Sequence, residues 1–320
     1  MKLCSLFLVM TSLCVCTRIL TTIMSSAETA VHIFRELESE DLRVLQVMEA
    51  AMSKHRFVPK RLIAKFAEFN LEEAAFRLDR LSGFHLIHKM RGAYVGYTLN
   101  YAAYDCLAIN AFVKAEVLEA FGKSLGVGKE ADVYDALSPD GKRVAVKFHR
   151  LGRISFRQTI RKRGYTTEHT AWLFQSRLAA EKEFEALELV FSHGVAVPNP
   201  ISQNRHAIVM GMIEGAELSE CGRISRPEKV LKEVLRNIKK AYLKADVIHA
   251  DLSEYNIVLE PDMHILIIDW PQYVTKEHPN AKKLLMRDVK NLLGFFERKH
   301  LLKTSLEESL AYVTGKTESC

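Results

Sequence analysis

Two short segments toward the C-terminus combine side chains that could transfer a phosphoryl group. In the first, His249 to Asn256, the spacing H-x-D-L-x-x-x-N lets Asp251 orient or deprotonate an attacking hydroxyl. The amide oxygen of Asn256 and the carboxylate of Asp269, in the second segment, are hard ligands of the kind that Mg2+ prefers. This pair is typical of the catalytic and metal-binding loops of a kinase, and it predicts phosphoryl transfer that depends on ATP and Mg2+.

A glycine-containing loop and a lysine precede these segments in the order of a kinase N-terminal lobe. Strand-like stretches flank the loop, where glycines would let backbone N–H groups approach phosphates, although Ala131 stands where a third glycine is usual. After a turn at residues 138–141, the next strand ends in Val-Ala-Val-Lys and places Lys147 where it could pair with phosphates. The residues that we expect to bind nucleotide here are Gly126, Val127, Gly128, Lys129, Glu130 and Lys147.

The lysine of a kinase site needs a glutamate partner on a helix, and this sequence offers three. Residues 177–187 have a helical pattern that contains Glu181, Glu183 and Glu185. Their spacing does not choose among them, and the two that are not selected would be ordinary surface carboxylates.

Two apolar strands would position the rest of the site. Residues 207–210 lead into a hinge-like stretch, where Met210 and the backbone groups of Gly211 and Ile213 are expected at the adenine edge. Taken alone, this stretch is only a buried strand. Residues 265–268 form an apolar strand that would deliver Asp269, and Pro271 would restrict the loop that follows because its φ is fixed.

The N-terminal half has a different pattern, largely helical from about residue 27 to 110. Apolar residues in 42–52 recur at helical spacing and predict a first helix, Pro59 could start a second, and Asn70 with Glu73 resembles a capping box. Strand-like stretches then flank residues 91–92, a tight-turn signal. Helices followed by a basic hairpin suggest a winged helix, although an arbitrary helical domain with a solvated hairpin fits this pattern at least as well. Acidic residues accompany the basic ones on the third helix, so base-specific recognition of DNA is only weakly supported.

Composition sets broad limits on compartment and partners. The 45 basic and 39 acidic residues give a net charge of +6, a mild excess that matters only where it is concentrated. The six cysteines form neither a disulfide framework nor a zinc pattern, which favours a reducing, cytoplasmic compartment and no membrane partner. Residues 1–26 are expected to be an apolar leader or an extension from a misplaced start codon, with Met24 opening the protein.

The spacing of the motifs narrows the kind of kinase. After Asp269 the sequence is too short for the activation segment and helical lobe that ordinary protein kinases use to bind peptides. The short stretch between Met210 and His249 argues against small-molecule phosphotransferases, which remain an alternative. A winged-helix RNA-binding scaffold that holds nucleotide without turnover is a second alternative.

The motifs together resemble the RIO atypical kinases, in the second branch, which carries an N-terminal winged helix. The resemblance extends from about residue 27 to 310, and we therefore expect an α+β chain, a winged-helix domain followed by a compact bilobal kinase-like (RIO) domain. The segments that carry it are 126–131, 146–149, 182–184, 249–256, 268–272 and 287–291. The expected domains are residues 27–110 for the winged helix and 111–320 for the kinase, with an N-lobe at about 120–210 and a C-lobe at about 214–310.

The resemblance implies roles for particular residues. It selects Glu183 as the partner of Lys147, makes Asp288 a structural support of the catalytic loop, and implies that Asp269 becomes transiently phosphorylated in an ATPase cycle. It implies a serine/threonine kinase or ATPase that uses ATP with Mg2+, or Mn2+ as a second candidate. Trp270 replaces the phenylalanine that is more usual in this branch, and the absence of a long C-terminal tail looks archaeal.

The resemblance also implies partners. The expected partners are the pre-ribosomal small subunit with its rRNA, and a protein substrate or the chain itself as phosphoacceptor. Residues 149–165 are densely basic with interleaved aromatics, which suits contact with RNA phosphates, although a solvated loop fits this composition equally well.

Overall fold

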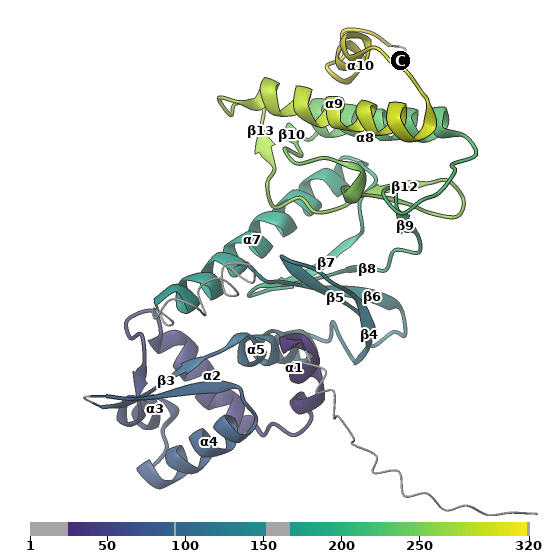
Figure 1. Cartoon of the computed structure of the whole chain (residues 1–320). Coiled ribbons are helices and arrows are strands. Elements are labelled where there is room, and N and C mark those ends of the chain that lie inside the picture. The colour runs from purple at the N-terminus through teal and green to yellow at the C-terminus, as the bar shows by residue number, and fades with distance from the viewer. Residues whose placement is uncertain (1–24, 93, 152–166, 319–320) are drawn as a thin grey trace, which may run out of the picture.

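The computed structural model describes residues 25–92, 94–151 and 167–318, which form three parts stacked along one axis (Figure 1). A helical part with a small sheet lies at one end, a five-stranded sheet with one long helix lies in the middle, and a mainly helical lobe lies at the other end. The predicted α+β class, a winged helix followed by a bilobal kinase-like domain, is confirmed. Across these residues we find no helix that is both long and apolar enough to span a membrane.

The N-terminal part has the element order of a winged helix. Its sheet is antiparallel in the order β1-β3-β2, and β2 with β3 forms the hairpin predicted around residues 91–92. The helix predicted as the first from residues 42–52 is the second, because a capping box between Ser25 and Glu28 starts an earlier one. The elements are α1 (Ser26–Phe34), α2 (Ser39–Ala51), β1 (Val58–Pro59), α3 (Lys60–Ala67), α4 (Leu71–Gly83), β2 (Ile87–Arg91), β3 (Val95–Leu99) and α5 (Tyr101–Lys114).

Helix α4, at the position of the base-reading helix in DNA-binding winged helices, uses its arginines inside the domain. Asn70 caps the helix by accepting the Glu73 N–H at 2.8 Å, but the Glu73 carboxylate binds Arg77 and does not complete the expected capping box. Arg77 and Arg80 both bind Asp41, whose side chain is buried. These two arginines therefore stabilise the domain and are not free for nucleic acid.

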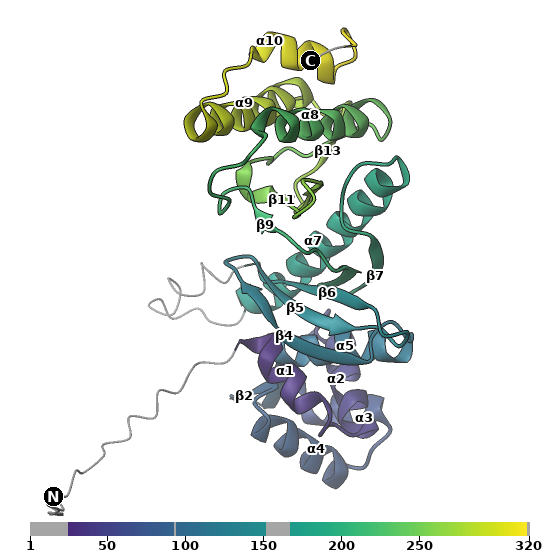
Figure 2. The same ribbon diagram turned by 90° about the vertical axis from the view of Figure 1, so that its right-hand side faces the viewer.

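The middle part is an antiparallel sheet in the order β4-β5-β6-β8-β7. Helix α7 lies against one face, and helices α1 and α5 lie on the opposite side (Figures 1 and 2). One continuous apolar core joins the sheet to those two helices, with Tyr134, Val146 and Phe148 packed in the same cluster as Ala27 and Phe112. The elements are β4 (Ala120–Val127), β5 (Ala131–Leu137), β6 (Arg143–His149), α7 (Thr167–Ser192), β7 (Pro200–Asn204) and β8 (Ala207–Gly211).

Helix α5 runs across the domain boundary that we placed at residue 110. It continues unbroken to Lys114, and the backbone reverses only at Glu116, which has a φ of 55°. The helix stays regular because its residues on both sides of position 110 are buried in the shared core. The boundary therefore lies in the turn after α5, just before β4.

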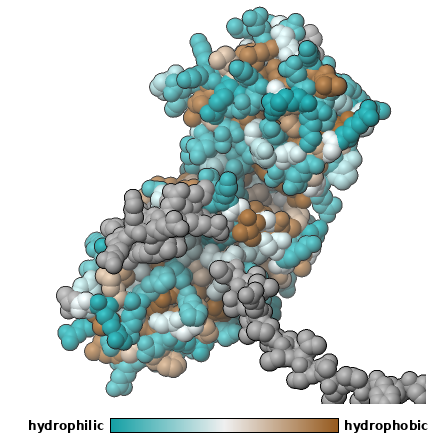
Figure 3. Space-filling model, in the orientation of Figure 1, coloured by the Kyte–Doolittle hydropathy of each residue, from teal (hydrophilic) through white to brown (hydrophobic). Residues whose placement is uncertain are grey.

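The C-terminal lobe is built around a separate apolar core. Helices α8 and α9 lie side by side and cover short strands that carry the catalytic segments (Figure 2). The face of this lobe seen in Figure 3 is largely hydrophilic, with apolar side chains in small groups. The elements are β9 (Ala216–Glu217), α8 (Pro227–Leu243), β10 (Val247–Ile248), a 3-10 turn η1 (Glu254–Asn256), β11 (Ile257–Leu259), β12 (Ile265–Ile267), β13 (Val274–Thr275), α9 (Ala281–His300) and α10 (Leu306–Val313).

Candidate active site

The catalytic loop is held from behind by a buried carboxylate. Helix α9 places Asp288 so that it accepts the N–H of Ala250 at 2.8 Å and that of Leu252 at 3.2 Å. The Arg287 side chain also donates to the Ala250 carbonyl. Burial raises the pKa of Asp288 to about 6, although these hydrogen bonds favour its charged form. The contacts fix the backbone on both sides of Asp251, whose own side chain is exposed.

Asn256 ties the catalytic loop to the metal-binding loop. Its Nδ2 donates to the Asp251 carbonyl at 2.9 Å, so the amide oxygen is left for another ligand. Its own carbonyl accepts the N–H of Ile268, the residue before Asp269, at 2.9 Å. Strands β11 and β12 pair directly beyond this bond. Asp251, Asn256 and Asp269 are thus brought to the same end of one hairpin.

Asp269 lies in a strained backbone conformation that its neighbours hold in place. Its φ is 67°, in the left-handed region that residues other than glycine seldom adopt. The next residue, Trp270, is buried, donates from Nε1 to the Ile267 carbonyl at 3.1 Å, and packs on His249 with ring centroids 4.5 Å apart. Pro271 follows and fixes one more dihedral.

Lys147 joins the two lobes. From β6, its Nζ donates to both carboxylate oxygens of Glu183 at 2.7 and 2.8 Å, and to Asp269 Oδ1 at 2.7 Å. Glu183 comes from α7, and its side chain is almost fully buried. Of the other two candidates on this helix, Glu181 pairs with Arg177 and Glu185 is exposed.

The charges of this cluster stabilise one another. Burial alone would raise the pKa of Glu183, but Lys147 and His149 lower it to about 2. Burial alone would lower the pKa of Lys147, but Glu183 and Asp269 raise it above its ordinary value. At neutral pH the lysine is therefore a fixed positive charge between two carboxylates.

The glycine loop is shorter than the sequence suggested. Gly126 and Val127 are part of β4 and pair with β5, so they are strand residues and not loop residues. The exposed turn is formed by Gly128, Lys129 and Glu130, and the Gly128 N–H donates to the Ala131 carbonyl at 2.8 Å. A Cβ on Gly128 would lie 3.1 Å from that carbonyl oxygen, which gives a steric reason for glycine at this position.

The expected adenine residues lie where the sheet meets the C-terminal lobe. Met210 is buried in β8, Gly211 ends that strand, and Ile213 follows it half-buried. The Gly211 N–H already donates to the Asn199 carbonyl at 2.8 Å, so we expect Gly211 to contact adenine through its own carbonyl oxygen.

The ligands on hand fit a magnesium ion that arrives with a nucleotide. Asn256 and Asp269 offer an amide oxygen and a carboxylate, and Mg2+ typically takes one or two protein ligands plus phosphates and water. Within residues 25–92, 94–151 and 167–318, no group of three or more His, Cys, Asp and Glu side chains could hold a metal ion. The donor set thus suits Mg2+ bound together with phosphates.

Sequence reasoning missed two features of the site. His149 Nε2 lies 2.9 Å from Glu183 Oε2, and the period of two along β6, which puts residues 147 and 149 on one face, could have indicated this. In the linker between the lobes, a Cβ on Gly215 would lie 2.5 Å from the Leu259 carbonyl oxygen, so only glycine allows this approach. No local pattern indicated that contact.

The prediction that residues 149–165 contact RNA is wrong for the first two of them. His149 and Arg150 were included in it, but both are buried, because their side chains bind carboxylates inside the protein. Residues 152–166, with the rest of the predicted basic cluster, lie outside the described residues, as do Met24 and the residues before it.

Comparisons with known proteins agree with this geometry. The family model described as the RIO domain matches residues 132–309, and that described as "Rio2, N-terminal" matches residues 34–115. The RIO-type serine/threonine-protein kinase Rio2 of Methanocaldococcus jannaschii is 42% identical over 277 residues, which are 82% of this chain and 100% of the relative. The serine/threonine-protein kinase rio2 of Schizosaccharomyces pombe is 37% identical, over 84% of this chain and 79% of the relative.

A solved structure is similar over nearly the whole chain. The Rio2 kinase of Chaetomium thermophilum, in a complex with ADP/Mg2+ and phosphoaspartate, matches with a TM-score of 0.78 and 32% identity, and 90% of each chain is covered. The two domain matches, the relatives and this structure agree on one assignment. The chain belongs to the RIO family of atypical kinases, in its Rio2 branch.

Proposed function

We propose that this protein uses ATP with Mg2+ to phosphorylate serine or threonine, or to hydrolyse ATP, during maturation of the small ribosomal subunit. The observation that carries the chemical part is the bridge from Lys147 to both Glu183 and Asp269, beside the Asp251–Asn256 loop. The naming of its relatives as serine/threonine-protein kinases supports the choice of acceptor.

Each residue has a role that follows from its position. Lys147 binds the nucleotide phosphates while Glu183 keeps its Nζ in place, because the glutamate holds the ammonium through both oxygens. Asp251 is exposed and accepts the proton of the attacking hydroxyl. Asn256 and Asp269 would hold Mg2+, or Mn2+ in its place, and the bound ion would supply charge neutralisation at the phosphates.

Asp269 is also proposed as a phosphoacceptor. Its carboxylate oxygen would form a bond to the γ-phosphorus as the bond to the β,γ-bridging oxygen breaks, and ADP would leave with the electron pair. Water would then hydrolyse the acyl phosphate and complete an ATPase cycle. The phosphoaspartate in the similar Chaetomium thermophilum structure supports this step.

The test is ATP turnover with Mg2+ by the wild type and by Asp251→Ala and Asp269→Ala variants, with and without purified small-subunit particles. We expect both variants to lose at least a hundredfold in kcat, in keeping with removal of a catalytic group. Asp262→Ala is the matched control, because this aspartate is exposed in the turn between β11 and β12. The same background rate in the wild type and in both variants would contradict the proposal and favour a nucleotide-binding scaffold.

The ribosomal role needs a separate measurement. Because Arg77 and Arg80 are engaged within the winged helix, we assign rRNA contact to the basic segment around Arg161, Lys162 and Arg163. Neutralising these three residues should weaken rRNA binding and reduce the slope of log affinity against log salt by about two to three. An unchanged slope would show that this segment does not contact rRNA.

A further inference from the structure

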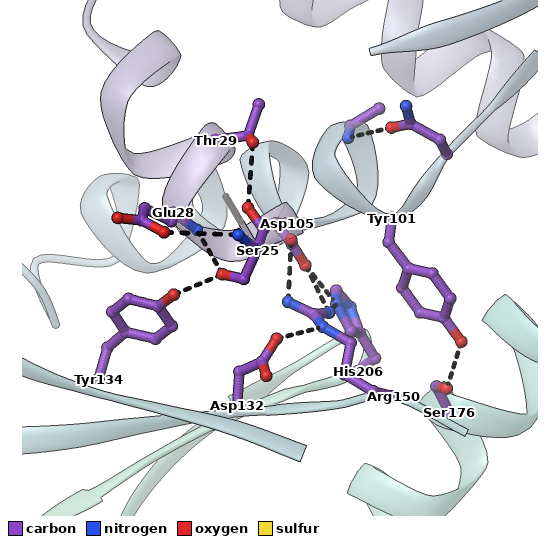
Figure 4. A network of polar contacts seen from close by, with 12 residues as sticks. Ser25, Glu28, Thr29, Tyr101, Asp105, Asp132, Tyr134, Arg150, Ser176 and His206 are labelled. Carbon is purple, nitrogen blue, oxygen red and sulfur yellow. Dashed lines mark hydrogen bonds and ion pairs between the residues drawn. The ribbon is translucent and has the colours of Figure 1, made fainter. Parts of the chain in front are cut away.

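A buried ion network joins helix α5 of the winged helix to the kinase N-lobe. Arg150, directly after β6, donates from both Nη atoms to the Asp105 carboxylate at 2.8 and 3.0 Å and from Nε to Asp132 at 2.9 Å (Figure 4). His206, in the turn between β7 and β8, places Nε2 2.6 Å from Asp105 and 2.8 Å from Arg150. All four side chains are buried.

Stability alone gives a weak reason for this network. A buried guanidinium between two carboxylates loses its hydration, and apolar residues of similar volume are often at least as stabilising. Burial would raise the pKa of Asp105, but Arg150 and His206 lower it, so the carboxylate stays charged. The network does fix the orientation of Arg150 relative to Asp105 and Asp132, because a guanidinium binds two carboxylates only in a fixed geometry.

The network reaches the proposed nucleotide site through the backbone of Arg150. The Arg150 N–H donates to the carbonyl of Glu130, in the glycine loop, at 2.6 Å. Asp132, in β5, stands two residues after that carbonyl, so Arg150 binds the loop at Glu130 and the strand directly after the loop at Asp132. The preceding residue, His149, faces the other way and contacts Glu183.

A second contact from α5 lies one helical turn before Asp105. The Tyr101 hydroxyl donates to the Leu151 carbonyl at 2.8 Å, and Ser176 Oγ accepts the Leu151 N–H at 3.0 Å. The Tyr101 hydroxyl also shares a hydrogen bond with Ser176 Oγ at 2.9 Å (Figure 4). Ser176 precedes Glu183 by two turns on the buried face of α7. Helix α5 therefore contacts both the strand end and the helix that hold the Lys147–Glu183 pair.

We propose that Arg150 is a positioning residue for the nucleotide, and that Asp105 of the winged helix sets ATP affinity by holding Arg150 against the glycine loop. The inference rests on the proposed function of the site. Arg150 does not touch the reacting atoms. It fixes Glu130 and Asp132 before ATP arrives, and so lowers the entropy that the loop loses on binding.

The test compares Arg150→Lys with Arg77→Lys in the full chain. A lysine keeps the charge but cannot bind both carboxylates as a fork. Arg77 is a matched control because it is also a largely buried arginine between carboxylates, in the winged helix but away from the glycine loop. Where Arg150→Lys fails to fold, Asp105→Asn carries the same test, because it removes the charge and keeps the shape.

Two readouts separate positioning from general destabilisation. Hydrogen exchange in nucleotide-free protein should speed up at residues 126–131 in Arg150→Lys and stay at the wild-type rate in Arg77→Lys. The Kd for ADP with Mg2+ and the KM for ATP should rise on the order of tenfold, with kcat at saturating ATP within about threefold of wild type.

If Arg150→Lys kept the wild-type rate of hydrogen exchange at residues 126–131 and the wild-type affinity for ADP, the proposal would be overturned. The same changes in Arg77→Lys would overturn it as well, because the effect would then come from lost stability. A wild-type protein that binds no ADP with Mg2+ would refute the proposed function instead, and the exchange rates would still decide whether Arg150 holds the loop.

Discussion

Replacing Glu183 by glutamine should measure how strongly the Lys147 pair stabilises the folded chain. Burial would raise the Glu183 pKa, but Lys147 and His149 lower it to about 2 from an ordinary value near 4.5. Because one pKa unit corresponds to about 1.4 kcal/mol, the charged glutamate contributes about 3 kcal/mol at pH 7. Glutamine has nearly the same shape and no charge, so Glu183→Gln should lose most of this free energy of unfolding.

The sign of the pH dependence follows from the lowered pKa. Below the ordinary pKa the unfolded chain takes up a proton that the folded chain does not, so the contribution is complete above about pH 4.5 and shrinks as the pH falls toward 2. The difference between wild type and Glu183→Gln should therefore be constant from pH 7 to 5 and should decrease by about 1 kcal/mol near pH 3.5.

Urea unfolding followed by tryptophan fluorescence provides the assay. The chain has two tryptophans, and in a Trp270→Phe background the remaining Trp172 reports on α7. Glu185→Gln, two residues farther along the same helix, is the control because Glu185 is exposed. If the two glutamine variants lost equal stability, or if the loss at Glu183 did not depend on pH, the ion pair would not have the strength that its geometry indicates.

Three further changes test the catalytic lobe. Asp288→Asn should lower kcat about tenfold. Burial raises the pKa of Asp288 to about 6, so the wild-type rate should fall below that pH as Asp288 is protonated, and the variant should lack this fall. Its free energy of unfolding should change little, because the loss of one hydrogen bond offsets the removal of a buried charge. Ala250→Gly should stabilise the C-lobe by about 0.5–1 kcal/mol, because the φ of 62° suits glycine, as urea unfolding followed by Trp270 in a Trp172→Phe background would show. Gly215→Ala should destabilise the same transition by about 1–3 kcal/mol through its clash with the Leu259 carbonyl, and an unchanged midpoint would mean that the linker can move aside.

Local geometry decides which relations between the predicted site residues the sequence can indicate. Asp251 and Asn256 belong to one short loop closed by its own hydrogen bond, so their spacing indicates their relation directly. Glu183 could not be chosen in this way, because Glu181 and Glu185 lie on the same helix and only the packing of α7 on the sheet decides which one meets Lys147.

The prediction failed where distant residues decide the environment of a side chain. Arg150 stands in a basic run and was expected to contact RNA, but its partners Asp105 and Asp132 are 45 and 18 residues away along the chain. No periodicity connects such positions. The fold class was predictable because helical and strand patterns are local, whereas the helix at Ser26–Phe34 was missed as a separate element before the one predicted from residues 42–52.

The shared core of the winged helix and the N-lobe limits which fragments of this chain could fold on their own. A cut after α5 would expose Phe112 on one fragment and Tyr134 and Phe148 on the other, so a fragment that starts at β4 should fold poorly and aggregate. The core of the C-lobe is a second cluster, but it includes Leu187 and Val190 of α7, so a cut after β8 would also expose apolar residues on both fragments. We therefore expect the winged helix and the N-lobe to fold only together, so that the catalytic unit begins at α1 and not at β4.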